Sequence, residues 1–343
     1  MDPLTQGALG AALPQAVYAH GPDRQKYQLA IAGLLGMLGG MAADLDVLIA
    51  SDTDPLLFLA YHRQFTHSLI FIPVGGLIVA AVLHVVLGRR WHLTFRQTAV
   101  ICMLGYATHA LLDTATSYGT MLLWPFADTR FSWSIISIVD PLFTLPLVLG
   151  VALSAMCNNP RFARIGLVWA LLYLGAGWWQ HQGARDMAAD LAASRGHAPT
   201  RFETKPSFGN ILVWKSVYEA GGRFHVDAVR VGVAPRVYAG TSVAKLDAGR
   251  DYPWLAPDSQ QARDIERFTG FSDGYAAVDP GNSNRIIDVR YSFVPNEIGA
   301  LFSIELAPGA DAAAHVRYRT HRDEAREQFG RLWRLMTGAA PDD

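Results

Sequence analysis

Long apolar segments alternate with short polar loops through the first half of this chain. Residues 69–88 form the clearest segment, twenty residues without a formal charge. A helix of this length, rising 1.5 Å per residue, crosses a hydrocarbon core about 30 Å thick. Residues 135–157 and 162–179 are similar runs, the first interrupted only by Asp140 and the second ended by Trp178 and Trp179. These runs predict transmembrane helices with aromatic residues at a membrane interface.

Three further apolar segments extend this pattern. Residues 29–50 and 98–116 carry acidic groups or His toward their C-terminal ends, and residues 4–19 are a weaker candidate that either spans or lies in the interface. We therefore predict a mainly α chain that begins with a polytopic transmembrane bundle of about five to six helices. A large soluble all-α protein is the alternative, and the uncharged run at 69–88 argues against it.

The pattern changes after residue 181. Residues 211–218 and 223–231 alternate between apolar and polar positions around Glu219-Ala220-Gly221-Gly222, which predicts a hairpin. Residues 286–294 and 300–306 predict a second strand pair, and residues 321–336 have helical periodicity. We expect a small α+β soluble domain here.

Composition supports the same division. Residues 1–180 hold 9 of the 29 Lys and Arg and 9 of the 30 Asp and Glu, so 41 of the 59 charges lie in the remainder. We predict a transmembrane domain at 1–181 and a soluble domain at 182–343. The net charge of −1 gives no field that attracts nucleic acid, so we expect a lipid bilayer and no nucleic acid as partner. The N-terminus has no basic region before a small-residue cleavage site, so no cleavable signal peptide is expected.

The loop charges predict an orientation. Lys and Arg gather in three loops that alternate with two loops whose only basic residues are Arg63 and Arg130. The residues of the basic loops are Arg24, Lys26, Arg89, Arg90, Arg96, Arg161 and Arg164. Basic loops favour the cytoplasm. We therefore expect a multi-pass protein of a bacterial inner membrane, with residues 51–68, 117–134 and 182–343 toward the periplasm.

His and Asp residues cluster at the predicted periplasmic ends of the helices. The residues are Asp44, Asp46, His62, His67, His109, Asp113 and Asp140. His109 and Asp113 are spaced i, i+4 and so lie on one helix face, whereas the i, i+5 spacing of His62 and His67 suits a loop. Each also has a purely structural interpretation, as a hydrogen-bonded core His or a capping Asp. However, ionisable groups at membrane depth are costly and usually face the bundle interior.

We therefore predict a divalent metal site, with roles for each residue. The predicted ligands of one ion or two are His62, His67, His109, Asp113, Asp44 and Asp46. The donor set suits zinc, with manganese or iron as alternatives. Asp44 and Asp46 are ligands or the general base, and Arg63 is a candidate phosphate contact. Thr66 and Ser68 would orient the imidazoles, and Asp140 would cap the helix that starts at Pro141, support the site, or both.

Five short motifs carry a resemblance to a known family. They are Met1-Asp2-Pro3-Leu4-Thr5, Ala43-Asp44-Leu45-Asp46, His62-Arg63-x-x-Thr66-His67-Ser68, Gly105-x-x-x-His109-x-x-x-Asp113 and Trp124-Pro125-Phe126. In these motifs the chain resembles the bacterial inner-membrane metal-dependent hydrolases, also called LexA-binding inner-membrane-associated hydrolases, and more distantly zinc-dependent phospholipase C. The resemblance covers roughly residues 1–150 and implies metal-dependent hydrolysis. It departs at Gln6, where many members have His, which implies a weaker or smaller metal site.

Two functions fit these observations. The first is a membrane-embedded metal-dependent hydrolase that attacks an ester or phosphodiester in a lipid or cell-envelope molecule. The second is a non-catalytic metal-binding scaffold or envelope-stress protein whose soluble domain binds a partner. A transporter fits less well, because the charges gather at one face instead of lining a path through the bilayer. The sequence leaves the substrate and the oligomeric state open.

Overall fold

The chain folds into two compact units. The computed structural model describes residues 1–17, 28–321 and 325–338, so Arg24 and Lys26 lie outside the described residues. The first unit comprises Met1–Leu48, Tyr61–Trp178 and Phe208–Asn210, and the second comprises Ile49–Ala60, Trp179–Ser207 and Ile211–Asp343. Ile49–Ala60, within the predicted range 1–181, thus belong to the second unit, and Phe208–Asn210, within 182–343, belong to the first.

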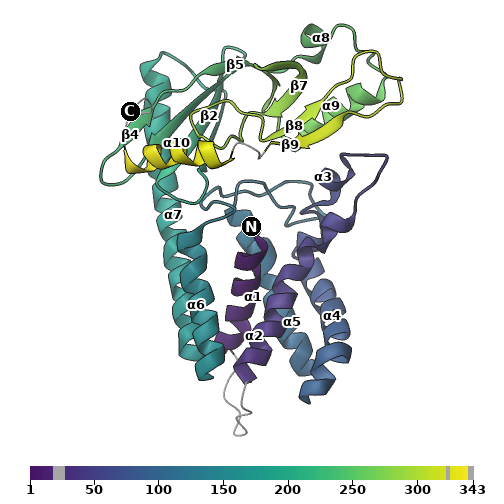
Figure 1. Cartoon of the computed structure of the whole chain (residues 1–343), viewed down its shortest axis with the longest axis vertical. Coiled ribbons are helices and arrows are strands. Elements are labelled where there is room, and N and C mark those ends of the chain that lie inside the picture. Colours follow the sequence, from purple (N-terminus) through teal and green to yellow (C-terminus); the bar gives the residue numbers. More distant parts are fainter. Residues whose placement is uncertain (18–27, 322–324, 339–343) are drawn as a thin grey trace. The chain divides into compact units, whose positions relative to one another are not determined.

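The first unit is a bundle of helices joined by irregular segments (Figure 1). Its elements are α1 (Pro3–Val17), α2 (Gln28–Met41) with the 3-10 helix η1 (Ala42–Leu48), η2 (Phe65–His67), α4 (Phe71–Leu83) with the short turns η3 (His84–Gly88) and η4 (Arg89–Trp91), α5 (Phe95–Ala115), α6 (Pro141–Cys157) and the first part of α7 (Pro160–Ser194). The short α3 (Leu57–Tyr61) precedes η2. Figure 1 shows α1 between α2 and α6, and it packs against both and against α5.

Three helical segments of the described chain are long and apolar enough to cross a membrane. They are Gln28–Leu48, Phe71–Trp91 and Pro160–Ser194. The predicted count of five to six spans is therefore not supported. The helices α1 and α6 have only 15 and 17 residues, and α5 has 21 residues but places His109 and Asp113 in its last two turns. The run predicted at 135–157 is shortened because its helix begins only at Pro141.

Glycines let three of these helices approach closely. A methyl group on Gly105 of α5 would overlap the carbonyl oxygen of Gly36 in α2, and one on Gly10 of α1 would meet the same oxygen. Small residues at such crossings allow backbone-to-backbone packing inside a membrane bundle. The consequence for the site is that the last turns of α5 lie directly against the backbone at the end of α2.

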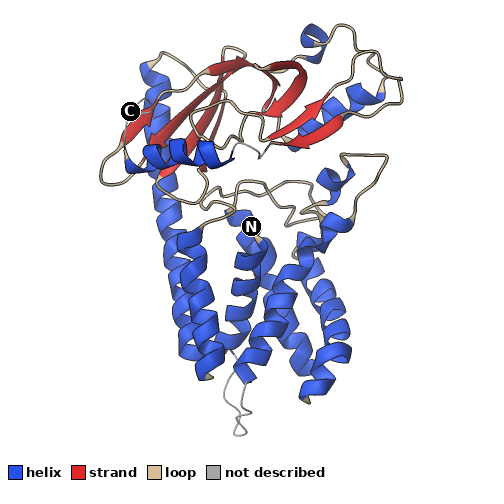
Figure 2. Ribbon diagram, viewed as in Figure 1, coloured by secondary structure: helices blue, strands red, loops and turns tan. Residues whose placement is uncertain are grey.

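The second unit contains all the named strands, drawn red in Figure 2. One sheet has the order β1-β2-β3-β4 with β5 also paired to β3, and the other has the order β6-β7-β8-β9. The strands are β1 (Arg201–Pro206), β2 (Val213–Ala220), β3 (Arg223–Arg230), β4 (Arg236–Tyr238), β5 (Ser242–Ala244), β6 (Ala276–Asp279), β7 (Asn282–Asp288), β8 (Phe302–Glu305) and β9 (Arg317–Thr320). Three helices accompany them, α8 (Ala248–Asp251), α9 (Gln260–Phe271) and α10 (Ala325–Thr337).

The predicted hairpin is confirmed, with β2 and β3 antiparallel and Ala220 paired to Arg223 across a turn of two glycines. Gly221 and Gly222 both have positive φ, as this turn requires. The second predicted pair is confirmed only in part. Strands β7 and β8 are antiparallel neighbours, but β7 ends at Asp288, so the expectation of a strand through residue 294 was wrong.

The core under the second sheet explains why Ile49–Ala60 belong to this unit. Leu56 and Leu59 pack in one cluster with Ile265 and Phe268 of α9. Both guanidinium nitrogens Nη1 and Nη2 of Arg267 donate to the carboxylate of Asp54, each at 2.9 Å. The segment is thus fixed by buried apolar side chains and a bidentate ion pair, neither of which its own sequence indicates.

Candidate metal centre

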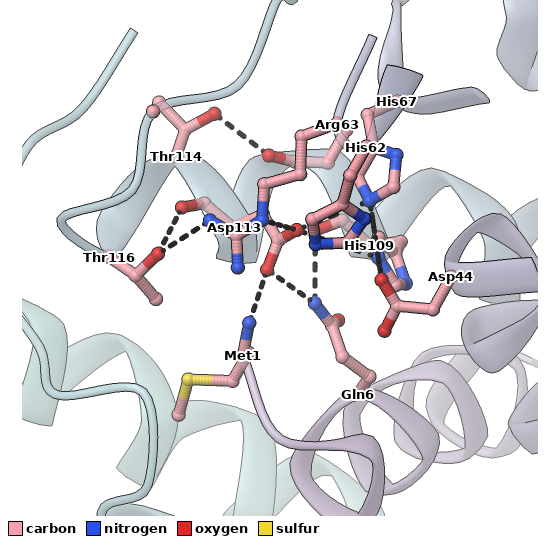
Figure 3. Close-up of polar contacts among 12 residues, drawn as sticks. Met1, Gln6, Asp44, His62, Arg63, His67, His109, Asp113, Thr114 and Thr116 are labelled. Carbon is pink, nitrogen blue, oxygen red and sulfur yellow. Dashed lines mark hydrogen bonds and ion pairs between the residues drawn. The ribbon is translucent and has the colours of Figure 1, made fainter. Parts of the chain in front are cut away.

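Four side chains from three separate elements meet at the end of the bundle that holds η1 and η2. Asp44 comes from η1, His67 from η2, and His109 and Asp113 from α5, and each offers a ligand atom within 4.8 Å of the others. We call these four residues the primary cluster (Figure 3). Its two Nε2 atoms are 3.0 Å apart, and each lies 3.3–3.6 Å from Asp44 Oδ1 and from Asp113 Oδ2.

The protonation of His109 follows from its outer contact. Its Nδ1 lies 2.5 Å from the carbonyl oxygen of Gly40. A carbonyl oxygen only accepts, so Nδ1 must carry the hydrogen. In the neutral tautomer that this contact selects, Nε2 is therefore the nitrogen that presents a lone pair to the primary cluster. Metal-ligating histidines are oriented in this way by a carbonyl or carboxylate behind the ring.

The same reasoning applies to His67. The hydroxyl of Thr66 donates to Asp46 Oδ2 at 2.8 Å, which commits its only hydrogen. Thr66 Oγ1 is also 2.9 Å from His67 Nδ1, so here it must accept and Nδ1 must donate. The Nε2 atom of His67 is left facing His109. In both imidazoles of the primary cluster, Nδ1 thus holds the outer contact, and Nε2 is the atom available to ligate a metal ion.

The surroundings of His67 favour a positive charge at this point. Burial by itself lowers the pKa of this side chain, but hydrogen bonds with Asp113, Asp44 and Asp46 outweigh it and raise the pKa to about 10. The side chain is fully buried. Carboxylates that raise the pKa of an adjacent imidazole provide a negative field, and a divalent cation also requires such a field.

Asp113 accepts hydrogen bonds on one carboxylate oxygen and forms an ion pair through the other. Its Oδ1 accepts from the amino group of Met1 at 2.5 Å and from Gln6 Nε2 at 2.9 Å. Its Oδ2 lies 3.0 Å from Arg63 Nε, without a well-aligned hydrogen bond among the described residues. Arg63 also donates from Nη1 to Thr116 Oγ1. The buried guanidinium therefore positions Asp113, and the phosphate contact predicted for Arg63 stays a prediction.

Arg63 has an unusual backbone. Its φ of +62° lies in the left-handed region, which non-glycine residues rarely adopt. Its N–H donates to Asp46 Oδ2 at 3.1 Å, and its carbonyl accepts from the N–H of Met121 at 3.0 Å. Strained residues of this kind persist where surrounding contacts fix them and often lie at functional sites.

Gln6 occupies the position at which the resemblance leads one to expect His. It is fully buried and donates to Asp113, while its Oε1 has no hydrogen-bond partner in the described part of the chain. An amide of this kind offers a donor and a carbonyl oxygen but no imidazole nitrogen. Gln6 therefore supports Asp113 and leaves the nitrogen ligands of the centre to His67 and His109.

A second group adjoins the primary cluster. Asp44, Asp46 and His62 also offer ligand atoms within 4.8 Å of one another. His62 Nδ1 is 2.8 Å from Asp46 Oδ1, and the side chain of His62 is 28% exposed whereas that of Asp46 is fully buried. We call these three residues the outer cluster. All six predicted ligands therefore lie together, divided between two groups that share Asp44.

The donor set fits a divalent transition metal. Two imidazole nitrogens and two carboxylate oxygens are ligands that zinc, manganese and iron all accept. Asp113 Oδ2 and the two Nε2 atoms converge with few hydrogen-bond partners of their own, which is the arrangement expected of atoms that complete their coordination on an ion. The outer contacts through Gly40 and Thr66 supply the orientation that such ligands need.

Two of the predicted supporting residues lie elsewhere. The hydroxyl of Ser68 donates to the carbonyl of Phe65. Asp140 is the N-cap of α6, accepting from the N–H of Phe143 at 3.3 Å and from the hydroxyl of Tyr173 at 2.9 and 3.0 Å. The structure therefore brings Thr66 into the centre, but it does not bring in Ser68 or Asp140.

This placement predicts the outcome of Asp140→Asn. Asn caps a helix about as well as Asp, and the described partners of Asp140, Phe143 and Tyr173, belong to neither cluster. We expect unchanged metal content on elemental analysis. Asp140→Ala, which removes the cap, should lower stability by about 1–2 kcal/mol, seen as a lower thermal midpoint in detergent. A loss of metal in the Asn variant without loss of stability would instead connect Asp140 to the site.

Sequence reasoning missed three contributors. The Met1 amino group donates to Asp113, the hydroxyl of Thr116 accepts from Arg63, and the carbonyl of Gly40 accepts from His109. Only the position of Thr116, three residues after Asp113, gave a local signal. A backbone carbonyl and an amino group have no residue-type signature, so the residue types along the chain do not indicate these two roles.

Comparison with known proteins places this site in a family. The chain is 30% identical to inner membrane protein YbcI of Escherichia coli (strain K12) over 157 residues, which are 43% of this chain and 83% of YbcI. It is 22% identical to the uncharacterized protein YfhP of Bacillus subtilis (strain 168) over 131 residues, 38% of this chain and 39% of YfhP. No solved structure matches. The family model of the YdjM inner membrane protein matches residues 1–184, more than half of the 343 residues, and the chain therefore belongs to the YdjM inner membrane protein family.

Proposed function

We propose that this protein binds a divalent transition metal ion at the primary cluster of Asp44, His67, His109 and Asp113. The observation that carries the proposal is the pair of Nε2 atoms 3.0 Å apart, each turned toward two carboxylates by a contact that the opposite ring nitrogen makes outside the cluster. Such a pair is unfavourable unless a proton or a metal ion lies between the groups. An ion also accounts for the residues that orient each ligand from outside.

We further propose that the centre is hydrolytic and acts on an ester or phosphodiester of a lipid or cell-envelope molecule. The relatives are named for the inner membrane and not for a reaction or for LexA binding, so this step rests on the site. A bound divalent ion would activate water and polarise the bond to be cleaved. Asp44, with a side chain 27% exposed, is the ligand of the primary cluster that solvent reaches most readily.

The periplasmic orientation is part of the same proposal. Helix α4 begins at Phe71, close after His67, and runs to the basic turn at Arg89 and Arg90, while α5 returns from there to Asp113. The metal centre and the basic turn therefore lie at opposite ends of this helix pair. Basic loops favour the cytoplasm, which puts the centre toward the periplasm.

The test uses the full chain purified in detergent. Elemental analysis should find a transition metal bound, and the loaded protein should cleave bis(p-nitrophenyl) phosphate or a phospholipid presented in nanodiscs, with chelation removing the activity. A bound metal whose absorption spectrum as the Co²⁺ form shows a closed tetrahedral site, together with no turnover, would favour the non-catalytic scaffold. Absence of any bound transition metal after loading would contradict the proposal itself.

A further inference from the structure

We infer that the centre is binuclear, with a second divalent ion held by the outer cluster of Asp44, Asp46 and His62 beside the first. The inference rests on the proposed metal binding and extends it. Its basis is that one carboxylate, Asp44, belongs to both groups of possible ligands. A carboxylate has two oxygens, so Asp44 can contribute to two ions at once and hold them as neighbours.

The distances allow the outer ion. Two ligands that are each about 2.0–2.2 Å from one tetrahedral ion lie about 3.3–3.6 Å apart, and the ligand atoms of the outer cluster lie within 4.8 Å of one another. His62 Nδ1 and Asp46 Oδ1 are 2.8 Å apart, a hydrogen-bond distance that would lengthen slightly when both atoms bind an ion. Little movement is therefore required to bring these atoms onto an ion.

Hydrogen bonds fix one carboxylate oxygen of Asp46 and leave the other directed at the outer cluster. Its Oδ2 accepts from the N–H of Arg63 at 3.1 Å and from the hydroxyl of Thr66 at 2.8 Å. Oδ1 faces His62 Nδ1 at 2.8 Å. The carboxylate is thus fixed through Oδ2 while Oδ1 remains for the outer cluster. Because Thr66 also orients His67, Asp46 links the outer ion to a ligand of the first.

The ligands of the two proposed ions differ in solvent exposure. The side chains of His67, His109 and Asp113 are at most 1% exposed, whereas those of His62 and Asp44 are 28% and 27% exposed. The first ion would therefore be enclosed, and the second would meet solvent. Two ions about 3.5–4 Å apart clamp both the attacking and the leaving oxygen of a phosphoryl or acyl group. This assigns an anionic ester, such as a phosphodiester headgroup, as the substrate class.

The test counts ions and does not depend on turnover. Full-length protein in detergent is loaded with Mn²⁺, and its metal content is measured by elemental analysis. We expect two ions per wild-type chain and an exchange-coupled Mn²⁺ pair in the electron paramagnetic resonance spectrum. His62→Ala should bind one ion and lose the coupled signal. His84→Ala is the matched control, because His84 lies in η3 and its Nδ1 is hydrogen-bonded to Thr98 Oγ1 at 3.1 Å. This variant should keep both ions.

Each other result has a definite meaning. One ion in the wild type and one in His62→Ala would overturn the binuclear inference and leave the primary ion intact. Two ions in His62→Ala would show that His62 is not a ligand and would also overturn it. No ion in the wild type would contradict the proposed function as well. Retention of one coordinated ion in His62→Ala shows that this variant is folded, and His62→Gln provides a second variant of similar size.

Discussion

His67→Ala is expected to abolish metal binding at the primary cluster. The substitution removes a nitrogen ligand and leaves Asp44 and Asp113 facing each other across the vacated space. Losing even an outer-shell partner typically weakens metal binding by about 10–100-fold, so losing a ligand should weaken it by more than about 100-fold. The affinity is measured by competition with a chromophoric chelator, using protein purified in detergent. His109→Ala should give the same result, because its Nε2 is equivalent in the cluster.

A graded pair of controls shows whether the loss is specific. Thr66→Val keeps every ligand but removes the hydroxyl that fixes the His67 tautomer, so it should fall in the range of about 10–100-fold. His84→Ala removes a histidine from the same bundle and should change nothing. Equal losses in all the variants would indicate a general folding defect. Wild-type affinity in His67→Ala would remove this histidine from the site.

The candidate metal ligands could be predicted from the sequence for a physical reason. Charged and polar groups are costly near apolar helices, so His109, Asp113 and Asp44 were conspicuous in otherwise apolar segments. The distribution of Lys and Arg placed them at one end of the bundle without any knowledge of the fold. The pattern could not indicate which ligand belongs to which cluster. Asp44 and Asp46 are separated by one residue, yet their side chains have different exposure and different partners.

The membrane helices show where the pattern reaches its limit. Hydropathy identified apolar segments but could not tell spanning helices from helices that are short or carry the site. Asp140 illustrates this: it caps α6, as one of its two interpretations predicted, so the helix begins at Pro141 and not at the start of the apolar run 135–157. The glycine contacts among α1, α2 and α5 are equally invisible in a hydropathy pattern, although they bring His109 to Gly40.

The second unit was predictable only through its local signals. The hairpin at Gly221 and Gly222 was found because two alternating runs flank a short glycine turn. Leu56 lies in one core cluster with Phe268, although the two residues are far apart in the chain. Contacts of this kind depend on the whole fold, so neither periodicity nor turn residues could indicate them.

The largest stability effect in the second unit is expected from Arg290→Met. Arg290 Nε and Nη2 donate to the two oxygens of Asp288 at 2.9 and 2.7 Å. The Asp288 side chain is fully buried and that of Arg290 is 9% exposed. Removing one partner of such a pair leaves a buried charge without compensation, which costs about 3–5 kcal/mol. For a unit of this size that corresponds to a fall of roughly 6–20 °C in the unfolding midpoint.

The measurement follows thermal unfolding in detergent, with hydrogen–deuterium exchange of the β7 peptides to localise the change. Arg201→Met is the matched control, because Arg201 pairs with Asp273 at 2.6 Å but their side chains are 34% and 70% exposed. Exposed pairs contribute at most about 1 kcal/mol, so this variant should shift the midpoint little. The double variant Arg290→Met with Asp288→Leu should recover much of the lost stability, since no buried charge remains. Equal shifts of the unfolding midpoint in Arg290→Met and Arg201→Met would show that burial of the Arg290–Asp288 pair does not determine its contribution to stability. A double variant no more stable than Arg290→Met would show that the uncompensated carboxylate of Asp288 does not cause the loss of stability.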